Sequence, residues 1–211
     1  MNRRTVSTLL LAAGLAPTFG VSSQGFTPVE GKDFTRISPP RPTVTPGQVE
    51  VLEFFSYGCP HCSAFEPTLE AWAKRLPANV SLRHVPVPFL FNAENFQRTY
   101  YALESLGLVD SMQKKIFAAV HVEKLRLDKP EDIAALVGKN GGDPAKFLAA
   151  FKSFSVATAI SRAKKVTADY KIDSVPSLAI NGQYLTSPSM AGGSERALAV
   201  ADWLIAQARK G

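Results

Sequence analysis

The only two cysteines of this 211-residue chain lie close together, in the run Cys59-Pro60-His61-Cys62. An apolar segment, residues 49–55, precedes the run, and a segment with apolar residues at helical spacing follows it. A Cys-x-x-Cys pair at a strand-to-helix junction is typical of a thiol–disulfide active site, where two sulfurs alternate between disulfide and dithiol.

Two other interpretations of the cysteine pair have to be weighed, a structural disulfide and a structural zinc site. A disulfide across so short a loop adds only about 2 kcal/mol of stability, and a chain of this length buries a core without it. A structural zinc ion takes four ligands. The chain offers two thiols and three histidines, and no two of these histidines have the usual His-x(3–5)-His spacing. The redox dithiol is therefore the favoured interpretation.

The residues between the cysteines favour an ionised thiol at the first one. Pro60 suits the first turn of a helix, which places Cys59 at the helix N-terminus, where free backbone N–H groups and the helix dipole favour an anion. His61 adds positive charge or a hydrogen bond. We therefore expect the pKa of Cys59 to lie below its usual value of about 8.5, and Cys62 to be the more buried, resolving thiol. A stabilised thiolate is a good leaving group, so the Cys59–Cys62 disulfide is expected to be a strong oxidant.

The elements that position these residues can be read from the hydrophobic pattern. The order is strand, helix, strand, a helical block, a hairpin and a final helix, which favours an α/β fold with a parallel sheet and an antiparallel edge. Asn181-Gly182 is the hairpin turn. The expected elements are a short edge strand within residues 32–37, strands at 49–55, 80–87, 177–180 and 183–185, helices from 60 and from 194, and helices throughout 92–170.

The N-terminal residues predict export. Arg3 and Arg4 precede a short apolar run, residues 6–16, and small residues follow it, which is the pattern of a cleaved secretory signal peptide over residues 1–24. Export places the mature chain in an oxidising compartment, the periplasm. The formal net charge is +6, but the basic residues are scattered and form no stripe with aromatic residues, so we expect no nucleic-acid partner.

Two segments carry a resemblance to a known family. The run from Glu53 to Cys62, Glu-Phe-Phe-Ser-Tyr-Gly-Cys-Pro-His-Cys, resembles the active site of the DsbA-type periplasmic thiol:disulfide oxidoreductases of the thioredoxin superfamily. The run Ser174-Val175-Pro176-Ser177, with the Asn181-Gly182 turn after it, resembles their cis-proline loop. The resemblance implies a thioredoxin fold, with a mixed central sheet flanked by helices, and an inserted α-helical domain. The implied division is a signal peptide at 1–24, a thioredoxin-like domain at 25–91 and 171–211, and the insertion at 92–170.

The resemblance also implies roles for the site residues. Cys59 is the thiol that forms the mixed disulfide, Cys62 is the partner that closes the ring, and Pro60 and His61 tune the redox potential. Pro176 is expected to be cis and to face the disulfide, with the backbone of Val175 pairing with substrate.

The roles of several further residues near the motif are open to more than one interpretation. Glu53 resembles the family's buried strand carboxylate, with a role in proton transfer, and the alternative is a surface strand residue. Glu66 is either a further charged neighbour or part of a solvated helix face. Arg83 lies on the strand where many members carry a lysine, and its register is open. We expect packing or surface positions for His84 and His121. Four apolar residues are candidates for an exposed apolar surface that contacts peptides, although core packing is the expected fate of each: Phe89, Leu90, Phe91 and Met190.

The function implied is that of a periplasmic oxidoreductase that donates the Cys59–Cys62 disulfide to reduced, folding exported proteins. A DsbB-type membrane protein would reoxidise it. The expected protein is a monomer with no metal and no cofactor other than the redox-active disulfide. One alternative is a disulfide isomerase or reductase. Such proteins usually dimerise through an added N-terminal domain, which we do not expect in the short segment before the first core strand. A second alternative is a non-catalytic binding or chaperone module, against which the two cysteines argue. A dedicated oxidase serving one pathway is a third alternative.

Overall fold

The computed structural model describes residues 26–44 and 47–209, so the predicted signal peptide lies outside the described residues. A five-stranded mixed sheet has the order β1-β5-β4-β2-β3. Its central strand, β2, runs parallel to β3 and antiparallel to β4, and β4 and β5 form the predicted hairpin. The strands are β1 Thr35–Arg36, β2 Val49–Phe55, β3 Val80–Pro86, β4 Ser177–Ile180 and β5 Tyr184–Thr186. This is the mixed sheet that the resemblance implied.

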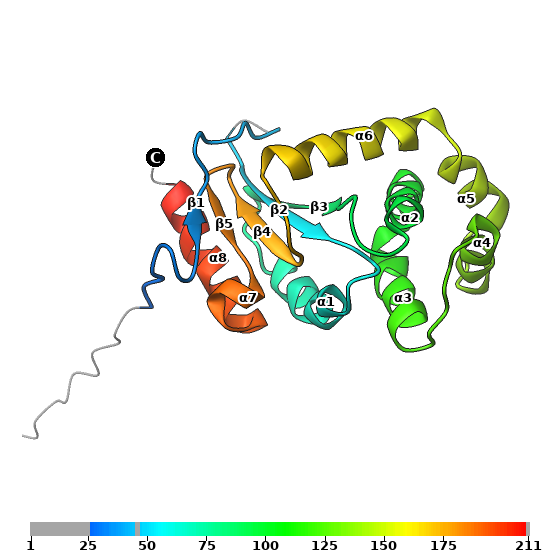
Figure 1. Cartoon of the computed structure of the whole chain (residues 1–211), viewed down its shortest axis with the longest axis horizontal. Coiled ribbons are helices and arrows are strands. Elements are labelled where there is room, and N and C mark those ends of the chain that lie inside the picture. Colours follow the sequence, from blue (N-terminus) through cyan, green and yellow to red (C-terminus); the bar gives the residue numbers. More distant parts are fainter. Residues whose placement is uncertain (1–25, 45–46, 210–211) are drawn as a thin grey trace, which may run out of the picture.

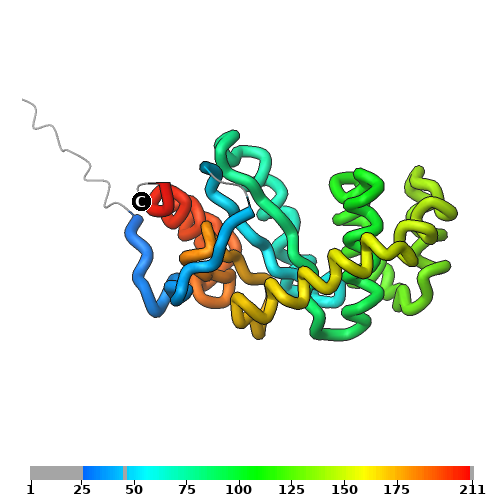
Figure 2. The backbone as a smooth tube through the Cα atoms, turned by 90° about the horizontal axis from the view of Figure 1, so that it is seen from above, coloured from blue at the N-terminus to red at the C-terminus, as the bar shows by residue number. Residues whose placement is uncertain are grey.

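Some helices pack on the sheet, and a group of others lies at one end of the molecule. Those near the sheet are α1 Pro60–Ala73, α7 Pro188–Ala191 and α8 Ser194–Ala208. The helical block consists of α2 Ala93–Ser105, α3 Val109–His121, α4 Pro130–Lys139, α5 Pro144–Phe151 and α6 Phe154–Asp169. Figure 1 shows α2 to α5 gathered at the end of the molecule away from α7 and α8. Figure 2 shows α6 in yellow, running from this outer group back to the sheet.

Local capping explains where several helices begin. The Asp143 side chain accepts hydrogen bonds from the backbone N–H groups of Ala145 and Lys146, and proline occupies the first turn of α5. The Ser153 side chain caps α6 in the same way. Proline also opens α1, where Cys59 is the N-cap residue. The turn that starts α1 therefore sets the position of the first cysteine.

Two hydrophobic cores meet at β2, every residue of which is buried. On one face, Val51 packs with Leu69 and Trp72 of α1 and with apolar residues of α8. On the other face, Leu52 and Phe54 belong to a core that continues into the helical block. Burial on both faces explains why residues 49–55 read as a nearly continuous apolar run. The carboxyl end of this rigid strand leads directly into the cysteine motif.

Candidate active site

The two cysteines occupy the first turn of α1 with very different surroundings. The Cys62 N–H donates to the Cys59 sulfur over 3.3 Å. Both residues are free thiols in this structure. The Cys59 side chain reaches the edge of the protein surface, with 5% of its area exposed, whereas Cys62 is fully buried. Cys59 is therefore the sulfur that a partner protein reaches first.

The surroundings separate the acidities of the two thiols. The hydrogen bond from the Cys62 side chain, together with the backbone N–H groups of Cys62 and His61, lowers the pKa of Cys59 to about 6 in spite of its burial. The charge of His61 acts in the same direction. Burial raises the pKa of Cys62 far above its usual range, and the neighbouring Cys59 and Glu53 add to that rise. At neutral pH the pair therefore consists of one accessible thiolate and one buried thiol.

The loop before β4 lies against the first cysteine. The Val175–Pro176 peptide bond is cis, as the resemblance implied. The Cys59 thiol, when protonated, donates to the Val175 carbonyl over 3.5 Å. A pocket of about 490 Å³ adjoins this contact, with His61, Val175 and Pro176 along one part and the start of α7, from its N-cap Ser187 to Ser189, along the other. An extended polypeptide near Cys59 has room to lie in this pocket.

Glu53 is a buried carboxylate and not a surface strand residue. Its side chain is 1% exposed, and one carboxylate oxygen contacts His84 Nδ1 on the neighbouring strand. The other oxygen, Oε1, is buried and has no hydrogen-bond partner among the residues that the structure describes. Burial alone would lower the pKa of His84, but the hydrogen bond and charge of Glu53, with help from Glu66, raise it above the usual value. Glu53 therefore faces the buried end of the cysteine pair with one oxygen unoccupied.

The strand register decides where Arg83 and His84 of β3 lie. Glu53 pairs with His84 across β2 and β3, and Leu52 pairs with Arg83. Because side chains alternate between the two faces of a sheet, Arg83 points away from Glu53 and binds Glu50 over 3.2 Å on the opposite face. The register that was open for Arg83 therefore places it on the face opposite Glu53, and His84, which was expected to pack or to lie on the surface, contacts the Glu53 carboxylate.

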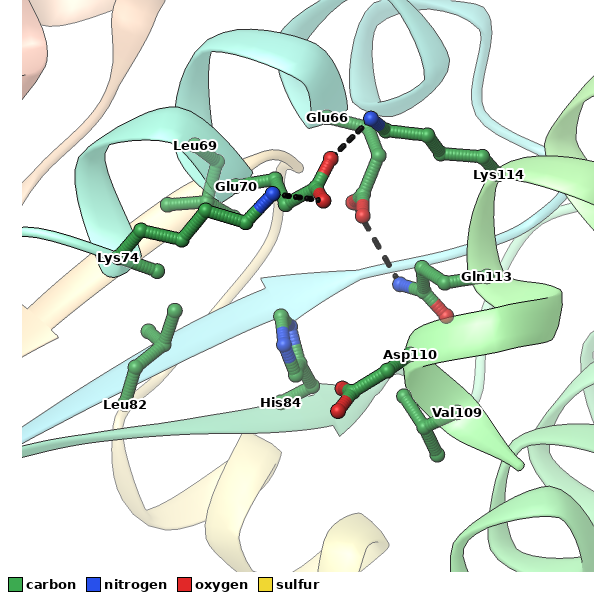
Figure 3. A pocket seen from close by; sticks show the side chains of 11 residues that line it. Glu66, Leu69, Glu70, Lys74, Leu82, His84, Val109, Asp110, Gln113 and Lys114 are labelled. Atoms are coloured by element: carbon green, nitrogen blue, oxygen red, sulfur yellow. Dashed lines mark hydrogen bonds and ion pairs between the residues drawn. The ribbon is translucent and has the colours of Figure 1, made fainter. Parts of the chain in front are cut away.

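Glu66 belongs to the same buried group and not to a solvated helix face. Its side chain extends from α1 toward Gln113 of α3, which donates to Glu66 Oε2 over 3.5 Å, as Figure 3 shows. The Tyr57 hydroxyl donates to the other end of Gln113. Burial, together with the charge of Glu53, raises the pKa of Glu66 to about 7. A carboxyl group with that pKa exchanges protons readily near neutral pH.

A pocket of about 450 Å³ opens between α1, β3 and α3, and both Glu66 and His84 line it. At its rim the Glu70 carboxylate binds Lys74 and also Lys114 of α3, as the dashed lines in Figure 3 show. The two lysines hold the pKa of Glu70 at about 2. The pocket therefore gives the buried carboxyl group of Glu66 a route to solvent.

Two contacts to the turn before α1 were not revealed by the sequence pattern. His121 Nε2 donates to the Tyr57 carbonyl over 2.7 Å. A Cβ atom built on Gly58 would lie 2.9 Å from the Phe91 carbonyl, so the loop between β3 and α2 touches the residue before Cys59. The expectation of a packing or surface position for His121 therefore missed its hydrogen bond to the active-site turn.

The loop that contacts Gly58 also carries exposed apolar side chains. Leu90 is 50% exposed and Phe91 is 54% exposed, so their predicted core packing was wrong, whereas Phe89 and Met190 are partly buried. Val122 and Leu125, in the loop after α3, are also exposed, and Arg126 of that loop lies over the Phe91 ring at 5.7 Å. The Asn92 side chain, which donates to the Leu127 carbonyl over 2.9 Å, joins the two loops. Leu90, Phe91, Val122 and Leu125 are called the apolar patch below.

Within residues 26–44 and 47–209, no group of three or more His, Cys, Asp or Glu side chains is placed to hold a metal ion. The same ranges contain no helix long and apolar enough to cross a membrane. The chemistry that these residues support is thiol–disulfide exchange at Cys59.

Comparison with known proteins agrees with this chemistry. The model of the DSBA-like thioredoxin domain matches residues 50–204. The thiol:disulfide interchange protein DsbA of Bordetella parapertussis is 41% identical over 213 residues, covering 100% of each chain. The protein of the same name from Pseudomonas aeruginosa is 36% identical over 209 residues, covering 98% of this chain and 97% of the relative.

Solved structures give the same picture. The crystal structure of Pseudomonas aeruginosa DsbA superposes with a TM-score of 0.83 at 37% identity, covering 86% of this chain and 95% of that one. The oxidoreductase NmDsbA1 of Neisseria meningitidis superposes with a TM-score of 0.77 at 29% identity, covering 86% and 94%. These similarities extend over the sheet, the cysteine motif and the helical block alike.

Proposed function

Because the chain belongs to the DSBA-like thioredoxin domain family, we propose that Cys59 and Cys62 are its reacting pair and donate their disulfide to exported proteins. The protein is a thiol:disulfide oxidoreductase that uses this redox-active disulfide in place of a separate cofactor. The division of the chain follows: a signal peptide at 1–24, a thioredoxin-like domain at 25–91 and 171–211, and an inserted helical domain at 92–170. The mature protein works in the periplasm, after removal of the signal peptide.

The first step is attack on Cys59. A substrate thiolate attacks the Cys59 sulfur of the oxidised protein, a substrate–Cys59 disulfide forms, and Cys62 leaves with the bonding electron pair. The pKa of Cys62 lies far above its usual range in the dithiol form, so the leaving sulfur takes up a proton. Glu53 relays this proton, because its charge acts on Cys62 and one of its carboxylate oxygens contacts His84. The raised pKa of Glu66 and the pocket beside it provide the exchange with solvent.

The second step releases the substrate. A second substrate thiolate attacks the substrate's own sulfur in the mixed disulfide, and Cys59 leaves as a thiolate. The low pKa of Cys59 makes it a good leaving group and leaves the enzyme as a dithiol. The substrate has then lost two electrons and two protons: the enzyme holds both electrons and one proton, as the Cys59 thiolate and the Cys62 thiol, and the second proton goes to solvent. This split in acidity between Cys59 and Cys62 is the observation that carries the proposal of a donor.

The surfaces beside Cys59 suit an extended, partly apolar substrate. One part of the polypeptide lies along Val175 and Pro176, where the backbone offers pairing as an added strand. The apolar patch, on the other side of the motif, takes up apolar side chains that a reduced, partly folded protein still exposes. A DsbB-type membrane protein reoxidises the dithiol. Pro60 and His61 set the potential, since both lie in the turn that holds the Cys59 sulfur.

Two reactions separate this proposal from its alternatives. The oxidised protein, mixed with a peptide that carries two thiols, should yield one peptide disulfide for each enzyme dithiol. The Cys62→Ser variant should accumulate a mixed disulfide with an oxidised peptide, and Cys59→Ser, the matched control, should form none. An isomerase would rearrange a two-disulfide peptide faster than it oxidises the reduced one, and a binding module would retain its activity in the double serine variant. Either result contradicts the donor function.

A further inference from the structure

A third pocket, of about 280 Å³, lies away from the cysteines, between the extended segment that follows β1 and the C-terminal end of α6. The charged residues that line it are Arg36, Arg41, Asp169 and Lys171, and Tyr170 lies among them. None of these residues takes part in the thiol chemistry described above. The pocket therefore needs an explanation of its own.

Two hydrogen-bond donors at this pocket have no acceptor. Tyr170 is 7% exposed, and its hydroxyl group is buried without a partner. Arg41 Nε is buried without a partner as well. Burying a donor without an acceptor is costly, and a guanidinium group donates only, so an arginine nitrogen cannot be satisfied by another donor. Among the described residues no side chain or backbone group fills this role, which indicates a missing acceptor.

The charges around the pocket indicate that the acceptor is an anion. Arg36 is paired with Glu30 over 2.9 Å, and Asp169 is paired with Lys165 over 2.7 Å. In contrast, Arg41 and Lys171 form no ion pair with any residue that the structure describes.

The remaining nearby carboxylate does not supply the missing charge. Glu50 is buried and binds Arg83 over 3.2 Å. Burial, together with the charge of Glu50, raises the pKa of Tyr170 to about 12, so its hydroxyl group stays protonated and able to donate.

The fold holds two of these groups in place. The Arg41 N–H donates to the Gly182 carbonyl over 2.8 Å, and a Cβ atom on Gly182 would lie 2.0 Å from the Arg41 carbonyl. Only glycine therefore allows the segment around Arg41 to lie this close to the hairpin turn. The Tyr170 ring packs against Phe54 at 5.5 Å between ring centres. Rigid placement reduces the entropy lost when these groups bind a ligand.

We propose that this pocket binds a small oxyanion, a phosphate or a carboxylate, between the guanidinium group of Arg41, the ammonium group of Lys171 and the hydroxyl group of Tyr170. The planar donor fork of arginine matches two oxygens of such an anion, and lysine adds a point charge. The site is independent of the disulfide-donor function, so either proposal can fail without the other.

The test is thermal unfolding of the oxidised protein in inorganic phosphate and in acetate, each up to about 50 mM and compared with chloride at equal ionic strength. A ligand that binds only the folded protein raises the midpoint in a saturable way. Arg41→Gln should weaken the binding about tenfold or more, since it removes a charged donor. Lys171→Gln should weaken it about threefold, because that residue is exposed. Lys139→Gln, an exposed control on α4, should change nothing, and the rate of disulfide donation should be the same in all variants.

Tyr170→Phe keeps the test decisive if Arg41→Gln does not fold. Loss of the hydroxyl group should weaken the binding of whichever anion raises the unfolding midpoint. The comparison of phosphate with acetate identifies whether the site prefers a phosphate or a carboxylate. The proposal is overturned if neither anion acts beyond chloride. The proposal is also overturned if Tyr170→Phe is more stable than the unsubstituted protein by the same amount in the presence and in the absence of the anion. The hydroxyl group would then be an unsatisfied donor that binds no ligand.

Discussion

The low pKa of Cys59 predicts that the reduced protein becomes more stable relative to the oxidised protein as pH rises. The pKa falls from 9.0 to about 6 on folding of the dithiol form. Between these values the unfolded chain holds a proton that the folded chain has released, so the free energy of unfolding rises with pH. The slope approaches about 1.4 kcal/mol per pH unit. Stabilisation is lost as pH falls through about 6, and it is complete near pH 9.

The size of the effect follows from the same two values. The excess unfolding free energy of the reduced protein over the oxidised protein should grow with pH. Compared with its value at pH 5, it should be about 1.4 kcal/mol larger at pH 7 and about 2.6 kcal/mol larger at pH 8. Other titrating groups are present in both redox forms and cancel in the difference. Above pH 9 the difference should decline, because the raised pKa of Cys62 then keeps a proton in the folded protein that the unfolded chain releases.

Urea unfolding of both redox forms at pH 5, 7 and 8 measures this difference, with the denaturant slope compared between forms. The reduced Cys62→Ser variant should keep most of the pH dependence, since a serine hydroxyl group still donates to the Cys59 sulfur. The Cys59→Ser variant should lose it. A difference between redox forms that stays flat from pH 5 to pH 8 would refute the argument that the first turn of α1 stabilises the thiolate.

Three further substitutions test the surroundings of the site. Glu53→Gln should slow exchange at Cys62 by about tenfold or more at pH 7 in stopped-flow measurements, because the proton relay is lost; an unchanged rate would exclude Glu53 from proton transfer. His84→Gln should cost about 3 kcal/mol of stability, since it breaks a buried pair with Glu53. Because the pKa of His84 is raised, this loss should be largest below about pH 6.5 and should become smaller as pH rises through that pKa. Urea unfolding at pH 5.5 and pH 9 measures the loss, and an equal loss at both pH values would contradict the pairing. Gly58→Ala should lower stability by about 1–3 kcal/mol, because its Cβ would lie 2.9 Å from the Phe91 carbonyl; an unchanged unfolding midpoint would mean that the loop yields freely.

Much of the fold was predictable because its signals are local. The apolar run of β2, the proline at the start of α1 and the Asn181-Gly182 turn each depend on a few neighbouring residues, and each element formed where it was predicted. The fold class was predicted correctly for the same reason. The acidity of Cys59 also follows largely from its own helix turn, so its low pKa was anticipated.

The partners of Glu53 were not predictable, since they depend on strand register. A shift of one residue between β2 and β3 would exchange His84 for Arg83, and nothing in the strand sequence distinguishes the two alignments. The burial of Glu66 depends on α3, which packs against α1 and brings Gln113 within hydrogen-bond distance.

The surfaces beside the site also depend on the tertiary structure and were not predictable from the sequence. Leu90 adopts a left-handed backbone conformation, with φ of 77°, and it and Phe91 are exposed, although their apolar side chains favoured a place in the core. Arg41 and Tyr170 share a pocket although most of the chain separates them. The sequence by itself determined which residues are proposed to react and which elements carry them, because those features are set by a single turn or strand. Only the tertiary structure decided which buried groups surround the reacting sulfurs, because pairing register and helix packing arise from contacts between distant parts of the chain.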